Sequence, residues 1–185
     1  MTAAPVTGIM LVLPAALADQ GFTLRSESEA DLPFLRRLYV STRWQELASF
    51  IDWTEAQKLA FLESQFALQR HHYRTYYPAT EFAVLEKNGV PAGRLYVDRQ
   101  ANNLCVIDIS LLPEWRGHGT GTALMNALCA EARAAGKKVS IAVEKFNPAQ
   151  TLYRRLGFRE VSDEGAHWFM EWTAPAGKRA DSNLS

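Results

Sequence analysis

The sequence predicts an α/β fold built around a mostly antiparallel sheet, and three observations support this prediction. Residues 81–98 alternate apolar and polar side chains on either side of Asn88-Gly89, which is a strong hairpin signal. Residues 104–112 add a third strand and complete a meander. A helical pattern over 122–135 then leads to a strand at 138–143, and this order requires a crossover to a parallel neighbour.

The segment before the meander predicts one strand and two helices. Residues 21–25 alternate in polarity and predict the first strand. Ser28 is a suitable N-cap, followed by acidic residues in the first turn, and predicts a helix that ends near Ser41. Thr54 begins a second periodic stretch, which predicts a helix that ends near His72.

The rest of the chain completes a single domain, which we expect to span residues 21–173. Pro148 suits the first position of a short helix that Gly157 ends, and two final strands are expected at 158–161 and 166–173. Residues 1–20 are expected to form a loosely ordered extension. Residues 174–185 contain almost no apolar side chains and are expected to be a disordered tail.

Composition argues against nucleic-acid and membrane partners and favours one cellular compartment. Lys plus Arg equals Asp plus Glu, 20 against 20, so no net field favours nucleic acid or an anionic membrane. The apolar run at 8–18 has no Lys or Arg before it and is too short to span a bilayer, which argues against secretion and a membrane anchor. The two cysteines, Cys105 and Cys129, lie in apolar segments, so we expect a reducing, cytoplasmic setting and no metal site.

The strongest local motif is Arg116-Gly117-His118-Gly119-Thr120-Gly121, which leads from a strand into a helix. Glycines at alternate positions allow backbone N–H groups to converge on an anion, and the helix N-terminus favours negative charge, so the motif predicts a diphosphate site. The alternative is a turn that only needs positive backbone angles. The third glycine comes too soon for a Rossmann fingerprint, and no Gly-Lys pair makes a P-loop.

At these residues the chain resembles the GNAT N-acetyltransferase superfamily. Arg116, Gly119 and Gly121 match the family's main motif, Arg/Gln-x-x-Gly-x-Gly/Ala, after a strand that ends in a Pro-containing bend. Asn147-Pro148-Ala149, followed by residues 152–158, is similar to the family's second cofactor motif. The resemblance extends from about residue 22 to residue 172 and is weakest before Pro78.

The resemblance implies a fold, a cofactor and a set of binding residues. The sheet would splay between its fourth and fifth strands, with helices on both of its faces, and admit acetyl-CoA. The strand that contains Ile109, Ser110 and Leu111 would align the pantetheine arm and present an N–H to the acyl carbonyl. Asn147 would hydrogen-bond the arm, and Tyr153 would lie near the sulfur. The CoA diphosphate would be held by the loop residues Arg116, Gly117, His118, Gly119, Thr120, Gly121 and Thr122.

Thioester chemistry explains these residue types independently. When an amine attacks the carbonyl, an N–H directed at the oxygen stabilises the developing charge, and a Tyr153 hydroxyl near the sulfur can protonate the leaving thiolate. The alternative for Tyr153 is simple core packing. Asp108, in an otherwise apolar strand, is the first candidate base, and its alternative is a structural Asp with an Arg partner. Glu144 is the second candidate, and its alternative is a solvated loop residue.

The sequence therefore predicts an acetyl-CoA-dependent N-acetyltransferase that modifies a primary amine. Two other functions remain open: a non-catalytic acyl-CoA-binding or regulatory module, and a phosphate-binding domain for a different nucleotide. The acceptor is expected to be a small molecule or a peptide amine, selected by the aromatic-rich residues 42–77. The protein is expected to be a monomer or a homodimer.

Overall fold

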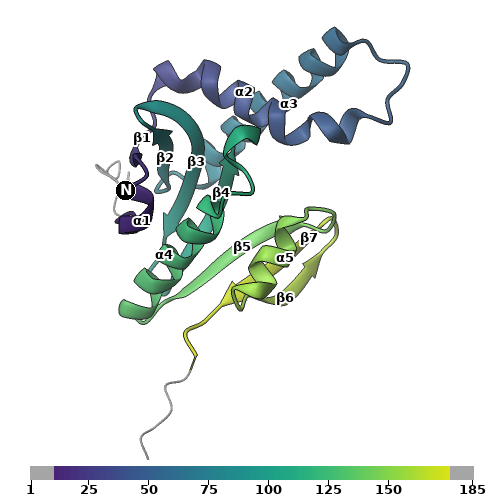
Figure 1. Cartoon of the computed structure of the whole chain (residues 1–185). Coiled ribbons are helices and arrows are strands. Elements are labelled where there is room, and N and C mark those ends of the chain that lie inside the picture. The colour runs from purple at the N-terminus through teal and green to yellow at the C-terminus, as the bar shows by residue number, and fades with distance from the viewer. Residues whose placement is uncertain (1–10, 176–185) are drawn as a thin grey trace, which may run out of the picture.

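The computed structural model describes residues 11–175, which form a seven-stranded sheet in the order β1-β2-β3-β4-β5-β7-β6 (Figure 1). The strands are β1 Phe22–Ser26, β2 Glu81–Lys87, β3 Val90–Arg99, β4 Asn103–Leu111, β5 Lys138–Glu144, β6 Arg159–Glu164 and β7 His167–Trp172. The α-helices are α1 Ala15–Ala18, α2 Leu32–Arg43, α3 Glu55–Tyr76, α4 Thr120–Ala134 and α5 Ala149–Arg155, with 3₁₀ turns η1 Glu29–Asp31, η2 Trp44–Leu47 and η3 Pro113–Trp115. Neighbouring strands are antiparallel except β4 and β5, which are parallel.

The predicted hairpin between β2 and β3 is confirmed. Asn88 and Gly89 both have positive φ, 51° and 78°, and Lys87 pairs with Val90 across the turn. Positive φ at both central residues matches the right-handed twist of the flanking strands, and Asn and Gly tolerate it best. β4 pairs with β3 in turn, so the meander forms as the sequence indicates.

The sheet opens between β4 and β5. The two strands pair only from Asn103 with Lys138 to Val106 with Ile141, although β4 continues to Leu111. Ile107 is the extra residue of a bulge, because Tyr96 pairs with Asp108 and the next residue of β3 pairs with Val106. A bulge bends its strand and increases the local twist, which turns the second half of β4 away from β5. The expected splay between the fourth and fifth strands is therefore present, and Figure 1 shows β5, β6 and β7 diverging from β4.

Helices cover both faces of the sheet, as expected. The side chains of successive strand residues point to opposite faces, and in β2 the fully buried Val84 and Leu85 belong to two different core clusters. The cluster around Leu85 includes residues of α4 and α5, whereas the cluster around Val84 includes residues of α2 and α3. Among the helices at 11–175, none is long and apolar enough to cross a bilayer.

Three segments differ from the sequence predictions. Residues 11–20 were expected to be loosely ordered, but they contain α1, and Leu11 and Leu17 are buried in the core beside α4. α3 continues past His72 to Tyr76, because His72 and Tyr76 stack one turn apart with ring centroids separated by 4.6 Å. β6 extends to Glu164, although all six of its residues are exposed, since pairing with β7 supplies its hydrogen bonds. The predictions for 1–10 and 176–185 lie outside the described residues.

Asp31 precedes α2, and the contribution of its ion pair to stability can be tested. Its carboxylate accepts hydrogen bonds from Arg25 and from the Ser28 backbone N–H, and these interactions lower its pKa from 3.8 to about 2, with Arg25 as the largest cause. Because the pKa of Asp31 is lower in the folded protein than in the unfolded chain, its ionised carboxylate stabilises the fold above about pH 4. This stabilisation is lost as the pH falls to about 2. Because the Arg25 side chain is 37% exposed, we expect Asp31→Asn to lower the free energy of unfolding by only about 1–2 kcal/mol at neutral pH.

Urea unfolding of Asp31→Asn and the parent protein at neutral and acidic pH tests this expectation. The difference should shrink as the pH falls, because protonation removes the same ion pair from the parent. Asp52→Asn, at an exposed loop position, is the matched control and should be neutral at both values. A deficit that is the same at low pH would show that the ion pair is not its source.

Candidate active site

The loop between β4 and α4 presents a row of unpaired backbone donors. The N–H groups of Gly117, His118, Gly119, Thr120, Gly121 and Thr122 make no hydrogen bond to any part of the chain that the structure describes. Gly117 and Gly119 have φ of 77° and 83°, so the chain here requires the left-handed conformation that glycine adopts without strain. The next amide, of Ala123, donates to the Gly119 oxygen and begins the regular helix. The arrangement is that of an anion site at a helix N-terminus.

The side chains of this loop offer fewer groups to a bound anion than its backbone does. The His118 side chain is exposed, as expected of a surface residue. The Arg116 guanidinium folds back on the strand end: Nε donates to the Leu111 oxygen at 2.7 Å, and Nη2 donates to Ser41 Oγ at 3.1 Å. Burial lowers its pKa, against the opposing charge of Glu114. Arg116 thus stabilises the end of β4, and to reach a diphosphate it would have to exchange these bonds.

The open edge of β4 offers main-chain groups to the gap in the sheet. The Leu112 N–H donates to Ala92 on β3, and the Ser110 oxygen also lies toward β3. Since backbone groups alternate along an antiparallel strand, the N–H groups of Ile109 and Leu111 point the other way, to the side from which β5 has diverged. The main-chain groups of Ile109 and Leu111 are therefore placed to pair with an extended ligand, whereas those of Ser110 face β3 within the sheet.

Tyr153 and Asn147 lie on the far side of this gap, in α5 and the loop before it. Tyr153 is 5% exposed and packs on Phe158 at a centroid distance of 5.8 Å. Its hydroxyl makes no hydrogen bond within residues 11–175, and burial, followed by the charge of Asp108, raises its pKa. Asn147 Oδ1 accepts from the Ala149 N–H at 2.9 Å at the start of the helix, and its Nδ2 group makes no hydrogen bond within residues 11–175.

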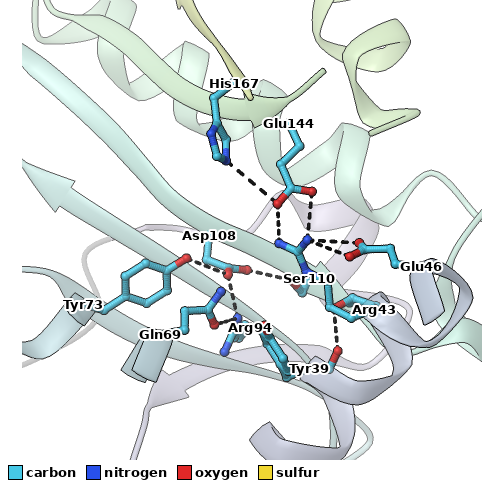
Figure 2. Close-up of polar contacts among 11 residues, drawn as sticks. Tyr39, Arg43, Glu46, Gln69, Tyr73, Arg94, Asp108, Ser110, Glu144 and His167 are labelled. Carbon is cyan, nitrogen blue, oxygen red and sulfur yellow. Dashed lines mark hydrogen bonds and ion pairs between the residues drawn. The ribbon is translucent and has the colours of Figure 1, made fainter. Parts of the chain in front are cut away.

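Asp108 is held in an ion pair rather than left free. Its Oδ2 accepts from Arg94 Nη2 at 2.6 Å and more weakly from the Tyr73 hydroxyl at 3.4 Å, while Oδ1 accepts from Ser110 Oγ at 2.6 Å (Figure 2). Arg94 is 3% exposed, and although burial opposes its charge, Asp108 raises its pKa. Gln69 on α3 accepts a further bond from Arg94 at 2.8 Å. The structural alternative for Asp108, an Arg partner, is the one that the structure shows.

Glu144 connects the end of β5 to helix α2. It lies at the end of β5, and both of its oxygens accept from Arg43 of α2, at 2.6 and 2.9 Å. Arg43 also donates to Glu46, and although burial opposes its charge, the two carboxylates raise its pKa (Figure 2). His167, the register partner of Glu144 on β7, has its Nε2 at 3.9 Å from Glu144 Oε1. Glu144 is thus part of a polar cluster and not a solvated loop residue.

Sequence reasoning missed the residues that organise these carboxylates. Arg94 is a charged residue within an apolar strand, the same signal that identified Asp108, and could have been found in that way. Tyr73 lies in the aromatic-rich region 42–77 that was expected to select the acceptor, whereas nothing in the sequence around Arg43 indicates the carboxylate that it contacts. Among residues 11–175, no group of three or more His, Cys, Asp or Glu side chains is placed to hold a metal ion.

Solved structures share this architecture. PaiA N-acetyltransferase from Thermoplasma acidophilum, solved in complex with coenzyme A, is 18% identical with a TM-score of 0.61 over 82% of this chain and 98% of that one. An acetyltransferase from Thermus thermophilus is 18% identical with a TM-score of 0.58 over 82% and 96% of the two chains. YncA from Salmonella typhimurium, solved with its cofactor acetyl-CoA, is 20% identical with a TM-score of 0.51 over 88% and 99%. At these identities the likeness establishes the fold.

Sequence comparison establishes the family. No functionally curated protein matches the chain significantly. The model of the Acetyltransferase (GNAT) family, however, matches residues 34–158, which is more than half of the 185 residues and includes both α4 with its preceding loop and α5. The family resemblance inferred from the two motifs is thereby confirmed, and the chain belongs to the GNAT acetyltransferase family.

Proposed function

We propose that this protein transfers the acetyl group of acetyl-CoA directly to a primary amine. The observation that carries the proposal is the row of six unpaired N–H groups from Gly117 to Thr122, at the mouth of a gap in the sheet. A Cβ atom added to Gly117, Gly119 or Gly121 would meet nothing within 4 Å, so the surface of this loop is open to a ligand. Two of the structural neighbours were solved with coenzyme A or acetyl-CoA, which agrees with this choice of ligand.

Different residues would bind the cofactor, stabilise the developing charge and donate the proton. The loop amides would hold the diphosphate, and the open edge of β4 would pair with the pantetheine amides as a neighbouring strand does. An N–H of Ile109 or Leu111 would stabilise negative charge on the carbonyl oxygen during attack. Tyr153, whose raised pKa keeps its hydroxyl protonated, would give a proton to the departing sulfur. Bond formation to nitrogen and loss of the thiol then occur in one ternary complex.

The acceptor would approach from the side of α2 and α3. The polar cluster of Tyr73, Asp108, Arg43 and Glu144 lies there. Arg43 neutralises Glu144, and Arg94 neutralises Asp108. Tyr39 on α2 is close enough to the cluster for the charges of Arg43 and Glu144 to affect its pKa, which burial raises. Two residues of this cluster, Arg43 and Tyr73, belong to residues 42–77, the region expected to select a small-molecule or peptide amine.

Calorimetry combined with a thiol-release assay tests the proposed function. The protein should bind acetyl-CoA in preference to ATP and NAD, and it should release thiol with at least one member of a panel of small primary amines and peptide α-amines. Binding without thiol release across the panel would favour the non-catalytic module. Equal affinity for acetyl-CoA, ATP and NAD would indicate a phosphate-binding domain for a different nucleotide.

A further inference from the structure

Neither carboxylate considered as the base has an oxygen left without a partner. Asp108 accepts from Arg94 through one oxygen and from Ser110 through the other. Glu144 is held through both oxygens by Arg43. Either carboxylate would have to give up part of its pairing with an arginine to accept the proton of the amine. The proton of the attacking amine therefore requires another acceptor.

His167 is the imidazole that borders the same site. It is the first residue of β7 and pairs in register with Glu144 of β5. Glu144 lies three residues after Ile141, the last β5 residue that pairs with β4. Its side chain is 45% exposed, and Figure 2 shows the ring directed toward the Glu144 carboxylate. Gln150, in the first turn of α5, donates to the Glu144 main-chain oxygen at 3.0 Å, so the helix that carries Tyr153 is fixed to this strand end.

The spacing of His167 and Glu144 suits an ammonium group. Their nearest atoms, Nε2 and Oε1, are 3.9 Å apart, which is too far for a direct hydrogen bond. A single nitrogen about 2.8 Å from each would donate to both. Glu144 Oε1 already accepts from Arg43 Nη2, and a carboxylate oxygen has a second lone pair for such a donor. We propose that these two atoms bind the ammonium of the acceptor and that His167 Nε2 takes its proton.

The proposal deepens the proposed function and rests on it. An ammonium bound here first loses one proton to solvent, which leaves the imidazole neutral, and the free amine attacks the thioester carbon. As the C–N bond forms and the C–S bond breaks, His167 takes the second N–H proton, and Tyr153 gives its proton to the sulfur. The imidazolium then returns its proton to the Tyr153 oxygen through water. The products are an amide, a thiol and the one proton released to solvent, and the protein regains its starting protonation.

The charges around His167 favour binding of a cation. Glu144 faces it from β5, with Arg43 of α2 on the other side of that carboxylate. Glu164, its register partner on β6, is exposed, and Lys145 beyond β5 is paired with Asp163. The only cations in this set are thus already neutralised by carboxylates. The site offers an incoming ammonium an acceptor pair of net negative charge, so the acceptor class is a primary amine that arrives protonated.

His167→Gln tests the assignment, because glutamine keeps a polar side chain but cannot act as a base near neutrality. With the panel amine that the parent protein turns over fastest, kcat/KM for the amine should fall about 100-fold. The pH profile of kcat/KM should differ between the parent and the variant, because the variant has no imidazole to accept the proton. Added imidazole should restore part of the rate, which a merely structural role would not allow.

His71→Gln is the matched control, since His71 is exposed on α3 and belongs to no contact described above. Both variants should keep the acetyl-CoA affinity and melting temperature of the parent. If His167→Gln retains the parent rate and pH profile, the assignment of the base is wrong while the proposed function stands. If the parent binds acetyl-CoA but acetylates no amine of the panel, both proposals fall.

Discussion

Replacing Tyr153 with Phe should lower kcat about 1,000-fold while leaving the affinity for acetyl-CoA nearly unchanged. The hydroxyl is the only polar atom of the side chain, and it makes no hydrogen bond within the described part of the protein. Phe therefore keeps the packing on Phe158 and removes only the proton donor. A large loss in kcat with little change in binding is the signature of an interaction that forms mainly in the transition state.

The environment of Tyr153 also sets the pH dependence. Burial raises the pKa of its hydroxyl, and the charge of Asp108 raises it further, so the group stays protonated throughout the neutral range. The parent protein should therefore show no loss of kcat from Tyr153 as the pH rises through that range. Single-turnover thiol release, with calorimetry for acetyl-CoA, measures the two effects separately.

Tyr76→Phe makes the same chemical change at a residue that is 68% exposed near the end of α3, and it should leave kcat unchanged. An equal loss in both variants would point to assay or folding effects rather than to proton donation. Turnover of Tyr153→Phe at the parent rate would remove Tyr153 from the mechanism. Core packing, the alternative for this residue, would then be its only role.

Much of the fold could be predicted from local sequence signals. The Asn88-Gly89 turn, the glycine loop before α4 and the alternation in the meander each depend on backbone preferences that few residue types satisfy. The parallel pairing of β4 and β5 followed from the intervening helix. The splay was implied by the family resemblance, and its physical origin, the bulge at Ile107, has no turn residue or glycine to mark it.

The site was predicted less completely because its contacts join distant parts of the chain. Asp108 was identified as a charged residue in an apolar strand, but its partner Arg94 lies on the neighbouring strand, and Tyr73 lies on α3. Arg43 and Glu144 are 101 residues apart in the sequence, and nothing local to either indicates the pair. His167 follows the β6–β7 turn, where a partly exposed histidine has no distinguishing pattern. Pairing of this kind becomes visible only when the register of the strands is known.

The glycine loop makes the second large prediction: Gly119→Val should weaken acetyl-CoA binding about 1,000-fold, as measured by calorimetry. Gly119 has φ of 83°, a conformation that a β-branched residue rarely adopts, so the backbone must rotate and redirect the adjacent amides. Loss of two hydrogen bonds to a charged phosphate, at about 1.5–3 kcal/mol each, accounts for this magnitude. No protein atom lies within 4 Å of the added Cβ, so clashes within the protein are not the cause.

Gly136→Val separates strain from function, because Gly136 follows the other end of α4 with φ of 65° and equally open space around a Cβ. Both variants should lose a similar amount of stability, about 1–2 kcal/mol, since both place a side chain in the left-handed region. Only Gly119→Val should lose acetyl-CoA, because only that residue lies within the row of unpaired amides. If both variants bound acetyl-CoA alike, the loop would be a turn with positive backbone angles and nothing more, and the diphosphate would have to be held elsewhere.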